Sequence, residues 1–333
     1  MTAVMHDTVT TAELKLTPAT QAGPLTGGLL TIDQLTGEQI KQILALAAKV
    51  KANPKAYAGA LAGTSVTMLF EKPSLRTRMS FEIGLTKLGA HVVYLDHSKS
   101  RLGQREAVKD YAKNLERWTD AIISRVFSHG VLSEMDLHAS IPVINALSDL
   151  EHPCQALADM QTLIEKFGSL DGLKVAYVGD GNNVCHSLML ACAKLGVSFT
   201  AVTPKGFEPQ FHVVKAAIKA AGETGATITI SRDVNDIKGH HAVYTDCWVS
   251  MGQEHQSGLR GGVFTHLQVD DDVMAIASEG LDEAAVFMHC LPAHRGEEVT
   301  DEVIDSDDSL VYEQAENRMW AQNALMLMVF GKA

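Results

Sequence analysis

Long apolar runs are missing from the sequence, and none approaches the roughly 20 residues that a membrane-spanning helix needs. Cysteine is scarce too, with five residues among 333 and no CxxC pair. This argues against a disulfide framework and favours a reducing compartment, the cytoplasm. The first 28 residues lack the basic start and apolar core of a secretory signal. Their Thr, Pro, Ala and Gly content predicts a flexible leader.

Positively charged residues are also fewer than negatively charged ones. The chain has 28 Lys and Arg and 40 Asp and Glu, and its formal net charge is −12. The negative charge of such a chain repels the phosphate backbone of a nucleic acid, so we expect no nucleic-acid partner. Because the chain has no apolar span, we also expect no membrane partner. A small anionic substrate in a locally basic pocket stays possible. The length of 333 residues exceeds one hydrophobic core and predicts two domains.

Short β-rich runs alternate with helical patterns along the rest of the chain. Strands are expected at 65–70, 91–95, 120–125 and 141–146, then at 174–178, 198–202, 226–230, 241–245 and 285–289. Helices are expected at 76–89, 105–118 and 152–168. This alternation predicts an α/β protein with two doubly wound parallel-sheet domains linked by helices. We expect domains at 29–168 and 169–313, and a C-terminal helix at 314–333 that packs back on the first domain.

The stretch "SLRTR" at 74–78 gathers positive charge and hydroxyl groups where a helix begins. Helix N-termini carry unpaired N–H groups and partial positive charge, so Ser74, Arg76 and Thr77 suit a phosphate group. A Ser cap followed by surface arginines is the alternative. Arg125 ends the strand 120–125, where an isolated arginine is more often a surface ion-pair residue.

Other polar clusters also follow expected strands. His152 and Gln155 stand at a helix start and could donate to a carbonyl oxygen, or merely cap the helix. "GDGNN" at 179–183 lacks the GxGxxG spacing of a dinucleotide loop, and Asn183 suits a carboxylate. Asp246 is a candidate partner for an ammonium group. Cys290 could be a core thiol, a nucleophile or a contact for an amine. No metal-ligand spacing such as HExxH occurs, so we expect no metal or other cofactor.

Taken together, "SLRTR", "HPCQ", "DCWVSMGQE" and "HCLPA" resemble the ordered motifs of the aspartate/ornithine transcarbamylase family, and the last two resemble its ornithine branch. The resemblance runs from about residue 29 to 332. It implies transfer of the carbamoyl group of carbamoyl phosphate to the δ-amine of L-ornithine, giving L-citrulline and phosphate, in arginine metabolism. It also implies a homotrimer with active sites near the subunit interfaces.

The resemblance further implies roles for individual residues. The carbamoyl-phosphate contacts would be Ser74, Leu75, Arg76, Thr77, Arg101, Arg125, His152, Gln155, Leu291 and Arg318. The ornithine contacts would be Asn145, Asn183, Asp246, Ser250, Met251 and Cys290. The residues at the reacting groups would be Arg125, His152 and Cys290, with Cys290 as a positioning residue rather than a nucleophile.

Two departures from the family pattern matter. Leu75 replaces the usual Thr, which is harmless if that position acts through its backbone N–H. The loop 98–106 resembles a segment that reaches into a neighbouring subunit's site, with either Arg101 or Gln104 as its contact. The polar, Gly-rich stretch 250–262 is expected to form a lid over ornithine.

Several rival interpretations remain at this point. The acceptor could be acetylornithine, succinylornithine, putrescine or aspartate, although Asp246 favours a free α-amino acid. The chain could also be a non-catalytic member that binds or regulates a partner. An oxidoreductase based on "GDGNN" is weak because of the glycine spacing. The same residues would serve arginine synthesis and arginine breakdown.

Overall fold

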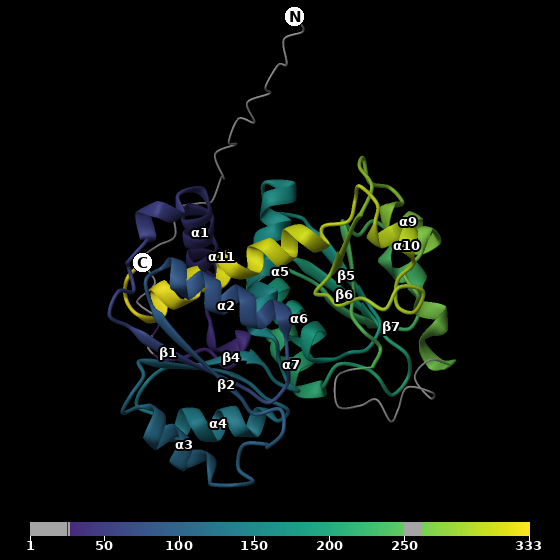
Figure 1. Cartoon of the computed structure of the whole chain (residues 1–333). Helices are drawn as coiled ribbons and strands as arrows, with labels where there is room; N and C mark the ends of the chain where they lie inside the picture. Colours follow the sequence, from purple (N-terminus) through teal and green to yellow (C-terminus); the bar gives the residue numbers. More distant parts are fainter. Residues whose placement is uncertain (1–24, 26, 250–261) are drawn as a thin grey trace, which may run out of the picture.

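Two parallel β-sheets flanked by helices make up the computed structural model, which describes residue 25 and residues 27–249 and 262–333 (Figure 1). This is the α/β fold with two doubly wound sheets that the sequence predicts. The expected leader lies largely outside the described residues, and of the expected lid only residue 262 lies within them. None of the helices described is both long and apolar enough to cross a membrane.

The first sheet has the strand order β2-β1-β3-β4. It consists of β1 (Ser65–Phe70), β2 (His91–Asp96), β3 (Ala121–Arg125) and β4 (Val143–Leu147), all paired in parallel. Helices α3 (Val108–Leu115) and α4 (His129–His138) cover one face, and α1 (Gly37–Ala52) and α2 (Leu75–Lys87) the other (Figure 1). Because the strands are parallel, their carboxyl ends share one edge.

The second sheet has the order β7-β6-β5-β8-β9 and is also parallel throughout. Its strands are β5 (Lys174–Val178), β6 (Ser198–Val202), β7 (Ile228–Ser231), β8 (Ala242–Thr245) and β9 (Val286–His289). Helices α6 (Asn183–Leu195) and α7 (Phe211–Thr224) pack on one face. Helices α9 (Asp271–Ser278) and α10 (Asp301–Ile304) pack on the other.

Helices α5 (Pro153–Phe167) and α11 (Val311–Val329) join the two sheets through a shared core. Buried side chains of both helices belong to the same apolar cluster as Val66 of β1 and Val175 of β5. Helix α11 packs against α1, α2 and α5, so the C-terminal helix returns to the first sheet as the sequence predicts (Figure 1). This shared core therefore fixes the position of one sheet relative to the other.

The expected strands lie within two residues of the observed ones, whereas the helices differ more. The helix expected at 105–118 spans only Val108–Leu115, because the chain already turns at residues 116–118. Helix α5 ends where Gly168 adopts the left-handed conformation, with φ 76°. Helix α1 was not foreseen, although its capping box of Thr36 and Gln39 is a sequence signal for a helix start. The exact limits of the two domains stay a prediction.

A glycine holds the turn between β5 and α6, where the "GDGNN" stretch lies. A Cβ on Gly181 would lie 2.3 Å from the backbone nitrogen of Pro209, and backbone cannot move aside as a flexible side chain can. Its own N–H donates to the carbonyl oxygen of Phe207 at 2.9 Å. The glycine therefore allows two loops to touch, which explains it without a dinucleotide.

The change Gly181→Ala should lower the free energy of unfolding by about 1–3 kcal/mol, because overpacking against backbone forces the loops apart. The matched control is Gly222→Ala in α7, where a Cβ meets open space. The control should raise the stability by up to about 1 kcal/mol through helix propensity. Urea denaturation of both variants measures this, and equal effects would show that the close approach at Gly181 is unimportant.

Candidate active site

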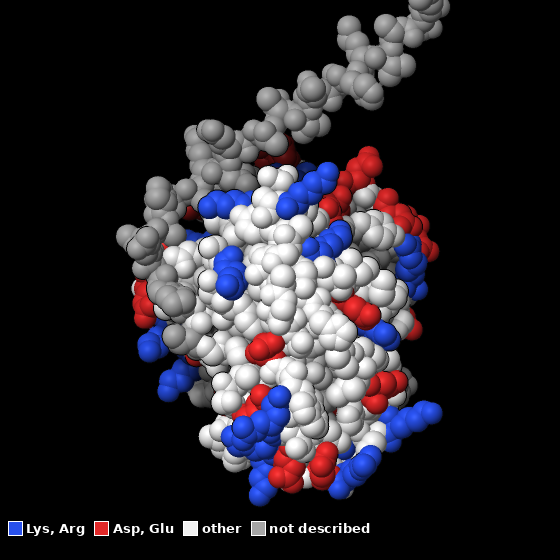
Figure 2. Space-filling model, turned by 60° about the vertical axis from the view of Figure 1, so that its left-hand side comes forward, with Lys and Arg blue, Asp and Glu red and all other residues white. Residues whose placement is uncertain are grey.

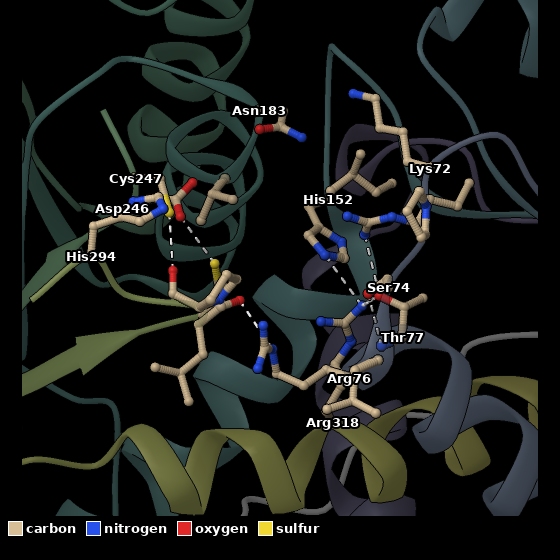
Figure 3. Close-up of a pocket in the computed structure, with 18 of the residues that line it drawn as sticks. Lys72, Ser74, Arg76, Thr77, His152, Asn183, Asp246, Cys247, His294 and Arg318 are labelled. Carbon is tan, nitrogen blue, oxygen red and sulfur yellow. Dashed lines mark hydrogen bonds between the residues drawn. The ribbon is translucent and has the colours of Figure 1, made fainter. Parts of the chain in front are cut away.

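A cavity of about 530 Å³ lies at the carboxyl ends of strands from both sheets. Doubly wound sheets bind their ligands at this edge. The lining side chains come from segments and helix starts that follow strands of both sheets, from the ends of β3 and β4, and from α11 (Figure 3). They belong to Lys72, Pro73, Ser74, Leu75, Arg76, Thr77, Arg125, Leu147, His152, Asn183, Val184, Asp246, Cys247, Val249, Cys290, Leu291, Pro292, His294, Glu297 and Arg318.

The start of α2 forms the basic wall of this cavity. Ser74 caps the helix, and its hydroxyl accepts a hydrogen bond from the backbone N–H of Thr77 at 3.3 Å. The Thr77 hydroxyl accepts from Arg125 Nη1 at 3.2 Å and from Arg318 Nη2 at 3.4 Å. Arg78 turns away, because its Nε donates to Glu82 Oε2 at 2.9 Å. A helix N-terminus thus meets two buried guanidinium groups, which is a suitable setting for an anion.

Positive charge on this wall is concentrated enough to change the acidity of its members. Burial, with Arg318 and Arg76 nearby, lowers the pKa of Arg125 to about 9. Burial and Arg125 lower the pKa of Lys72 to about 8. Burial and the neighbouring cations hold the pKa of His152 well below its usual value, so this imidazole is neutral. An arriving anion would relieve this mutual repulsion.

The neutral His152 ring has its proton position set by a neighbour. Arg318 Nη2 lies 3.2 Å from His152 Nε2. A guanidinium can only donate, so Nε2 accepts and the proton is on Nδ1. Nδ1 is buried and has no hydrogen-bond partner among the described residues. The ring therefore offers one unused N–H donor.

The opposite wall carries the acidic and thiol groups. Cys290 Sγ donates to Asp246 Oδ1 at 3.2 Å, and Asn182 Nδ2 donates to Asp246 Oδ2 at 2.8 Å. Burial and the Asp246 charge raise the pKa of Cys290 well above its usual value, so it remains a thiol. This disfavours the interpretation of Cys290 as a nucleophile, which requires the thiolate. Asn183 at the start of α6 lines the cavity too, and its Nδ2 donates to the carbonyl oxygen of Ser148 at 2.7 Å.

Arg76 reaches from the basic wall to the opposite one. Its Nε donates to the carbonyl oxygen of Leu291 at 3.1 Å, and Figure 3 shows this guanidinium between the two groups of side chains. Leu291 has φ 56°, a left-handed conformation that is unfavourable for a residue with a Cβ. Strained backbone of this kind concentrates at functional sites.

Three of the expected site residues lie outside the cavity lining. Gln155 is buried beneath it and accepts from Arg318 Nη1. Asn145 is fully buried, and its Nδ2 donates to the carbonyl oxygens of Leu30 at 2.8 Å and Glu151 at 3.3 Å. Arg101 stacks its guanidinium 4.0 Å from the centre of the Phe127 ring.

The other expected residues either line the cavity or cannot be described. Eleven line it: Ser74, Leu75, Arg76, Thr77, Arg125, His152, Asn183, Asp246, Cys290, Leu291 and Arg318. Ser250 and Met251 lie outside the described residues. None of these placements tests the binding roles themselves, which stay predictions.

Sequence reasoning missed Lys72, Cys247, His294 and Glu297. Lys72 had a signal, because it stands two residues before the helix cap. Cys247 also had a signal, because it stands next to Asp246 in the stretch "DCWVSMGQE". The approach of His294 and Glu297 to the cavity depends on how the loop after β9 folds.

Two groups of side chains have ligand atoms within 4.8 Å of one another and could hold a metal ion. They are Asp246 with His289 and Cys290, and Cys247 with His294 and Glu298. Most of these atoms already have protein partners. His289 Nε2 lies 3.2 Å from Glu298 Oε1, and Cys247 Sγ donates to the carbonyl oxygen of Pro292 at 3.0 Å. We therefore assign no metal to either group.

Lys72 should react with acylating reagents at lower pH than other lysines do. With its pKa lowered to about 8, about half of its amine is neutral at pH 8. An ordinary lysine with a pKa near 10.4 is less than about 1% neutral there. Trace acetylation followed by mass spectrometry should show preferential labelling of Lys72, which inorganic phosphate suppresses. Labelling no faster than at the exposed Lys55 would contradict the electrostatic account.

Comparison with known proteins shows what the chain is similar to. The model of the aspartate/ornithine carbamoyltransferase carbamoyl-P binding domain matches residues 28–165. The model of the Asp/Orn binding domain of the same family matches residues 171–329. The two matches together cover most of the chain.

The alignments with individual relatives cover nearly the whole length of those relatives. The ornithine carbamoyltransferase of Shewanella oneidensis is 49% identical over 301 residues, 90% of this chain and 98% of that protein. The solved ornithine carbamoyltransferase of Pyrococcus furiosus matches with a TM-score of 0.88 at 44% identity, over 93% of this chain and 99% of that one. The anabolic enzyme of Campylobacter jejuni matches with a TM-score of 0.86 at 33% identity, over 92% and 100%. The chain therefore belongs to the aspartate/ornithine carbamoyltransferase family.

Proposed function

We propose that the protein transfers the carbamoyl group of carbamoyl phosphate to the δ-amine of L-ornithine, giving L-citrulline and phosphate. The observation that carries the proposal is the division of one cavity into a wall of clustered cations and a wall around Asp246. The first suits a phosphorylated substrate and the second an amino acid with a positive charge. The names of the relatives point to the same reaction.

Carbamoyl phosphate would occupy the basic wall. The N-terminus of α2, the Ser74 and Thr77 hydroxyl groups, and Arg76 would hold the phosphate. The Leu75 side chain is 72% exposed, which supports a contribution through its backbone N–H and makes the loss of the usual Thr tolerable. Lys72 adds a further cation at the same edge.

The carbamoyl oxygen would then lie near Arg125, Arg318 and His152. As the amine attacks, negative charge develops on this oxygen, and preorganised donors stabilise it. Arg125 and His152 both line the cavity and are the candidates for such donors. Gln155 would act on the substrate through Arg318, which it contacts directly.

Ornithine would occupy the second wall. Asp246 would pair with its α-ammonium group, and Asn183 with its carboxylate. Only a neutral δ-amine can attack, and the cations across the cavity favour loss of its proton. The departing phosphate can accept a proton from the attacking amine, so the chemistry requires neither a cofactor nor a covalent enzyme intermediate. Holding both substrates together can contribute about 7–11 kcal/mol to lowering the barrier.

A panel of acceptors tests this proposal. Carbamoyl phosphate is offered with ornithine, acetylornithine, succinylornithine, putrescine and aspartate in parallel, and each product is detected separately. We expect strong turnover with ornithine alone, because an acylated α-nitrogen has no charge for Asp246 and putrescine has no carboxylate for Asn183. Turnover with another acceptor would overturn the assignment of ornithine as the acceptor. No turnover from folded protein would favour a non-catalytic role.

We also propose that the protein forms a homotrimer with active sites near the subunit interfaces. An apolar stripe on α2, formed by Leu75, Met79 and Ile83, is 40–72% exposed beside the cavity. Figure 2 shows a face whose centre carries few charged groups, with Lys, Arg, Asp and Glu gathered toward its edges. An exposed apolar stripe such as that of Leu75, Met79 and Ile83 commonly marks an interface. Arg101 or Gln104 would contact a neighbour's site across it.

Sedimentation of the full chain should show a single species of three chains, and a monomer at micromolar concentration would contradict the trimer.

Mixing two weakened variants tests the shared site. If Arg101 acts in a neighbour's site, subunit exchange between Arg76→Ala and Arg101→Ala should create some sites with neither defect and restore part of the activity. Repeating the mixture with Gln104→Ala shows whether Gln104 is the contact instead.

We further propose that the enzyme works in the cytoplasm and in arginine biosynthesis. All five cysteines are free, which suits a reducing compartment. The relatives from Pyrococcus furiosus and Campylobacter jejuni are named as anabolic enzymes, which supports the synthetic direction.

A further inference from the structure

A buried carboxyl group, Asp159 on α5, lies behind the cavity without lining it. Its Oδ1 accepts a hydrogen bond from Gln155 Nε2 at 2.8 Å and another from Gln314 Nε2 at 2.9 Å. Gln155 stands one turn earlier on α5, and Gln314 stands in the first turn of α11. Figure 1 shows these two helices side by side. Asp159 therefore joins them through a shared acceptor.

One branch from Asp159 leads to the basic wall. Gln155 Oε1 accepts from Arg318 Nη1, and Arg318 Nη2 lies close to both His152 and Thr77. A Gln amide has an oxygen on one side and an NH₂ group on the other. If its oxygen faces Arg318, its NH₂ must face Asp159. An acceptor at Asp159 thus holds the amide in the orientation that fixes Arg318.

The other branch leads to the opposite wall. Gln314 Oε1 accepts from the backbone N–H of His289 at 2.9 Å, at the end of β9. His289 Nδ1 accepts in turn from the backbone N–H of Leu291 at 2.8 Å. The carbonyl oxygen of Leu291 accepts from Arg76. The same amide logic applies, because an oxygen of Gln314 that faces His289 leaves its NH₂ facing Asp159.

Two NH₂ groups therefore converge on one buried position, and a carboxyl group can accept from both. Arg318, Tyr244, Cys192 and Cys290 are the charged and titratable groups that act on Asp159 from α11, β8, α6 and the segment after β9. Burial raises the pKa of Asp159 to about 7. Protonated or not, the carboxyl keeps an oxygen for the two amides.

We propose that Asp159 is a positioning residue that couples the two halves of the cavity, holding Arg318 through Gln155 and the segment 289–291 through Gln314. The inference rests on the proposed function, since that function gives Arg318 to carbamoyl phosphate and gives ornithine to the wall around Asp246, which Cys290 of this segment contacts. A substrate that fixes one wall then favours the arrangement of the other wall, without touching the second substrate.

The coupling can be measured with L-norvaline, which has the carbon chain, carboxylate and α-amine of ornithine but no δ-amine to react. Its Kd is determined by calorimetry with and without carbamoyl phosphate, and the ratio of the two values is the coupling factor. We expect tighter binding with carbamoyl phosphate, by a factor in the usual range of about 5–150. The KM values for both substrates are measured in parallel.

Three variants separate the branches. Asp159→Ala removes both, and should reduce the coupling factor toward one and raise both KM values by about tenfold or more. Gln314→Ala removes only the His289 branch, and should reduce the coupling while raising the KM of carbamoyl phosphate less than Asp159→Ala does, because the Gln155 branch to Arg318 stays intact. Thr162→Val is the matched control. Thr162 joins the same two helices by accepting from Asn317 Nδ2 at 3.1 Å, and among the described residues its hydrogen bonds go to Asn317 and Ala158, neither of which lines the cavity.

The outcomes distinguish this inference from the proposed function. If the wild type produces citrulline while folded Asp159→Ala and Gln314→Ala keep its KM values and coupling factor within twofold, the inference is wrong and the function stands. Equal losses in Thr162→Val would also overturn it, because they would show a general effect of loosening the helix pair. If Asp159→Ala does not fold, Gln314→Ala decides alone. A wild type that binds neither ligand would overturn both.

Discussion

The structure depends on bringing like charges together in a protein that is acidic overall. Lys72, Arg76, Arg125 and Arg318 meet at one wall of one cavity, and two of the guanidinium groups are more than nine-tenths buried. Their repulsion is tolerated because polar acceptors, such as the Thr77 hydroxyl and the Gln155 amide, hold them in place. A dianionic substrate would supply the missing negative charge, so binding and catalysis share one electrostatic origin.

The two sheets make this arrangement possible. The carboxyl ends of the strands in both sheets face the same cavity. The apolar core shared by α5, α11 and both sheets fixes the position of one sheet relative to the other. Segments at the edge of the first sheet, with α11, contribute cations, and segments that follow β8 and β9 contribute Asp246 and the Cys290 thiol. Because each wall comes from a separate unit, the acceptor could change between members of a family while the phosphate half stays the same.

The sequence predicts the parts of this site that depend on local order. Strand positions, the helix start at Ser74 and the residues after each strand follow from periodicity and capping. Lys72 was missed because a lysine in a loop is usually solvated, and its place two residues before the helix cap was the one sequence signal for its burial beside Arg125. Asn145 was expected at the site because it lies in a stretch that resembles a motif. Its amide instead donates hydrogen bonds to the backbone carbonyl oxygens of Leu30 and Glu151.

Contacts across long sequence separations could not be derived from local patterns. Arg318 is more than 160 residues from Gln155 and His152, and the shared acceptor at Asp159 emerges only once α11 lies against α5. The resemblance to a family supplied Arg318 as a site residue, but not the contacts that hold it. Tertiary packing decides such partners, and it also explains why the buried Gln314 carried no signal of its own.

The division of the cavity into two halves is the central claim, and the steady-state kinetics of Arg76→Ala and Asp246→Asn test it most directly. A lost hydrogen bond to a charged group corresponds to about 1.5–3 kcal/mol, or roughly 10–150-fold. We expect an increase of this size in the KM of carbamoyl phosphate for Arg76→Ala, and in the KM of ornithine for Asp246→Asn. If Asp246→Asn instead weakened only the use of carbamoyl phosphate, the assignment of the two walls would be wrong.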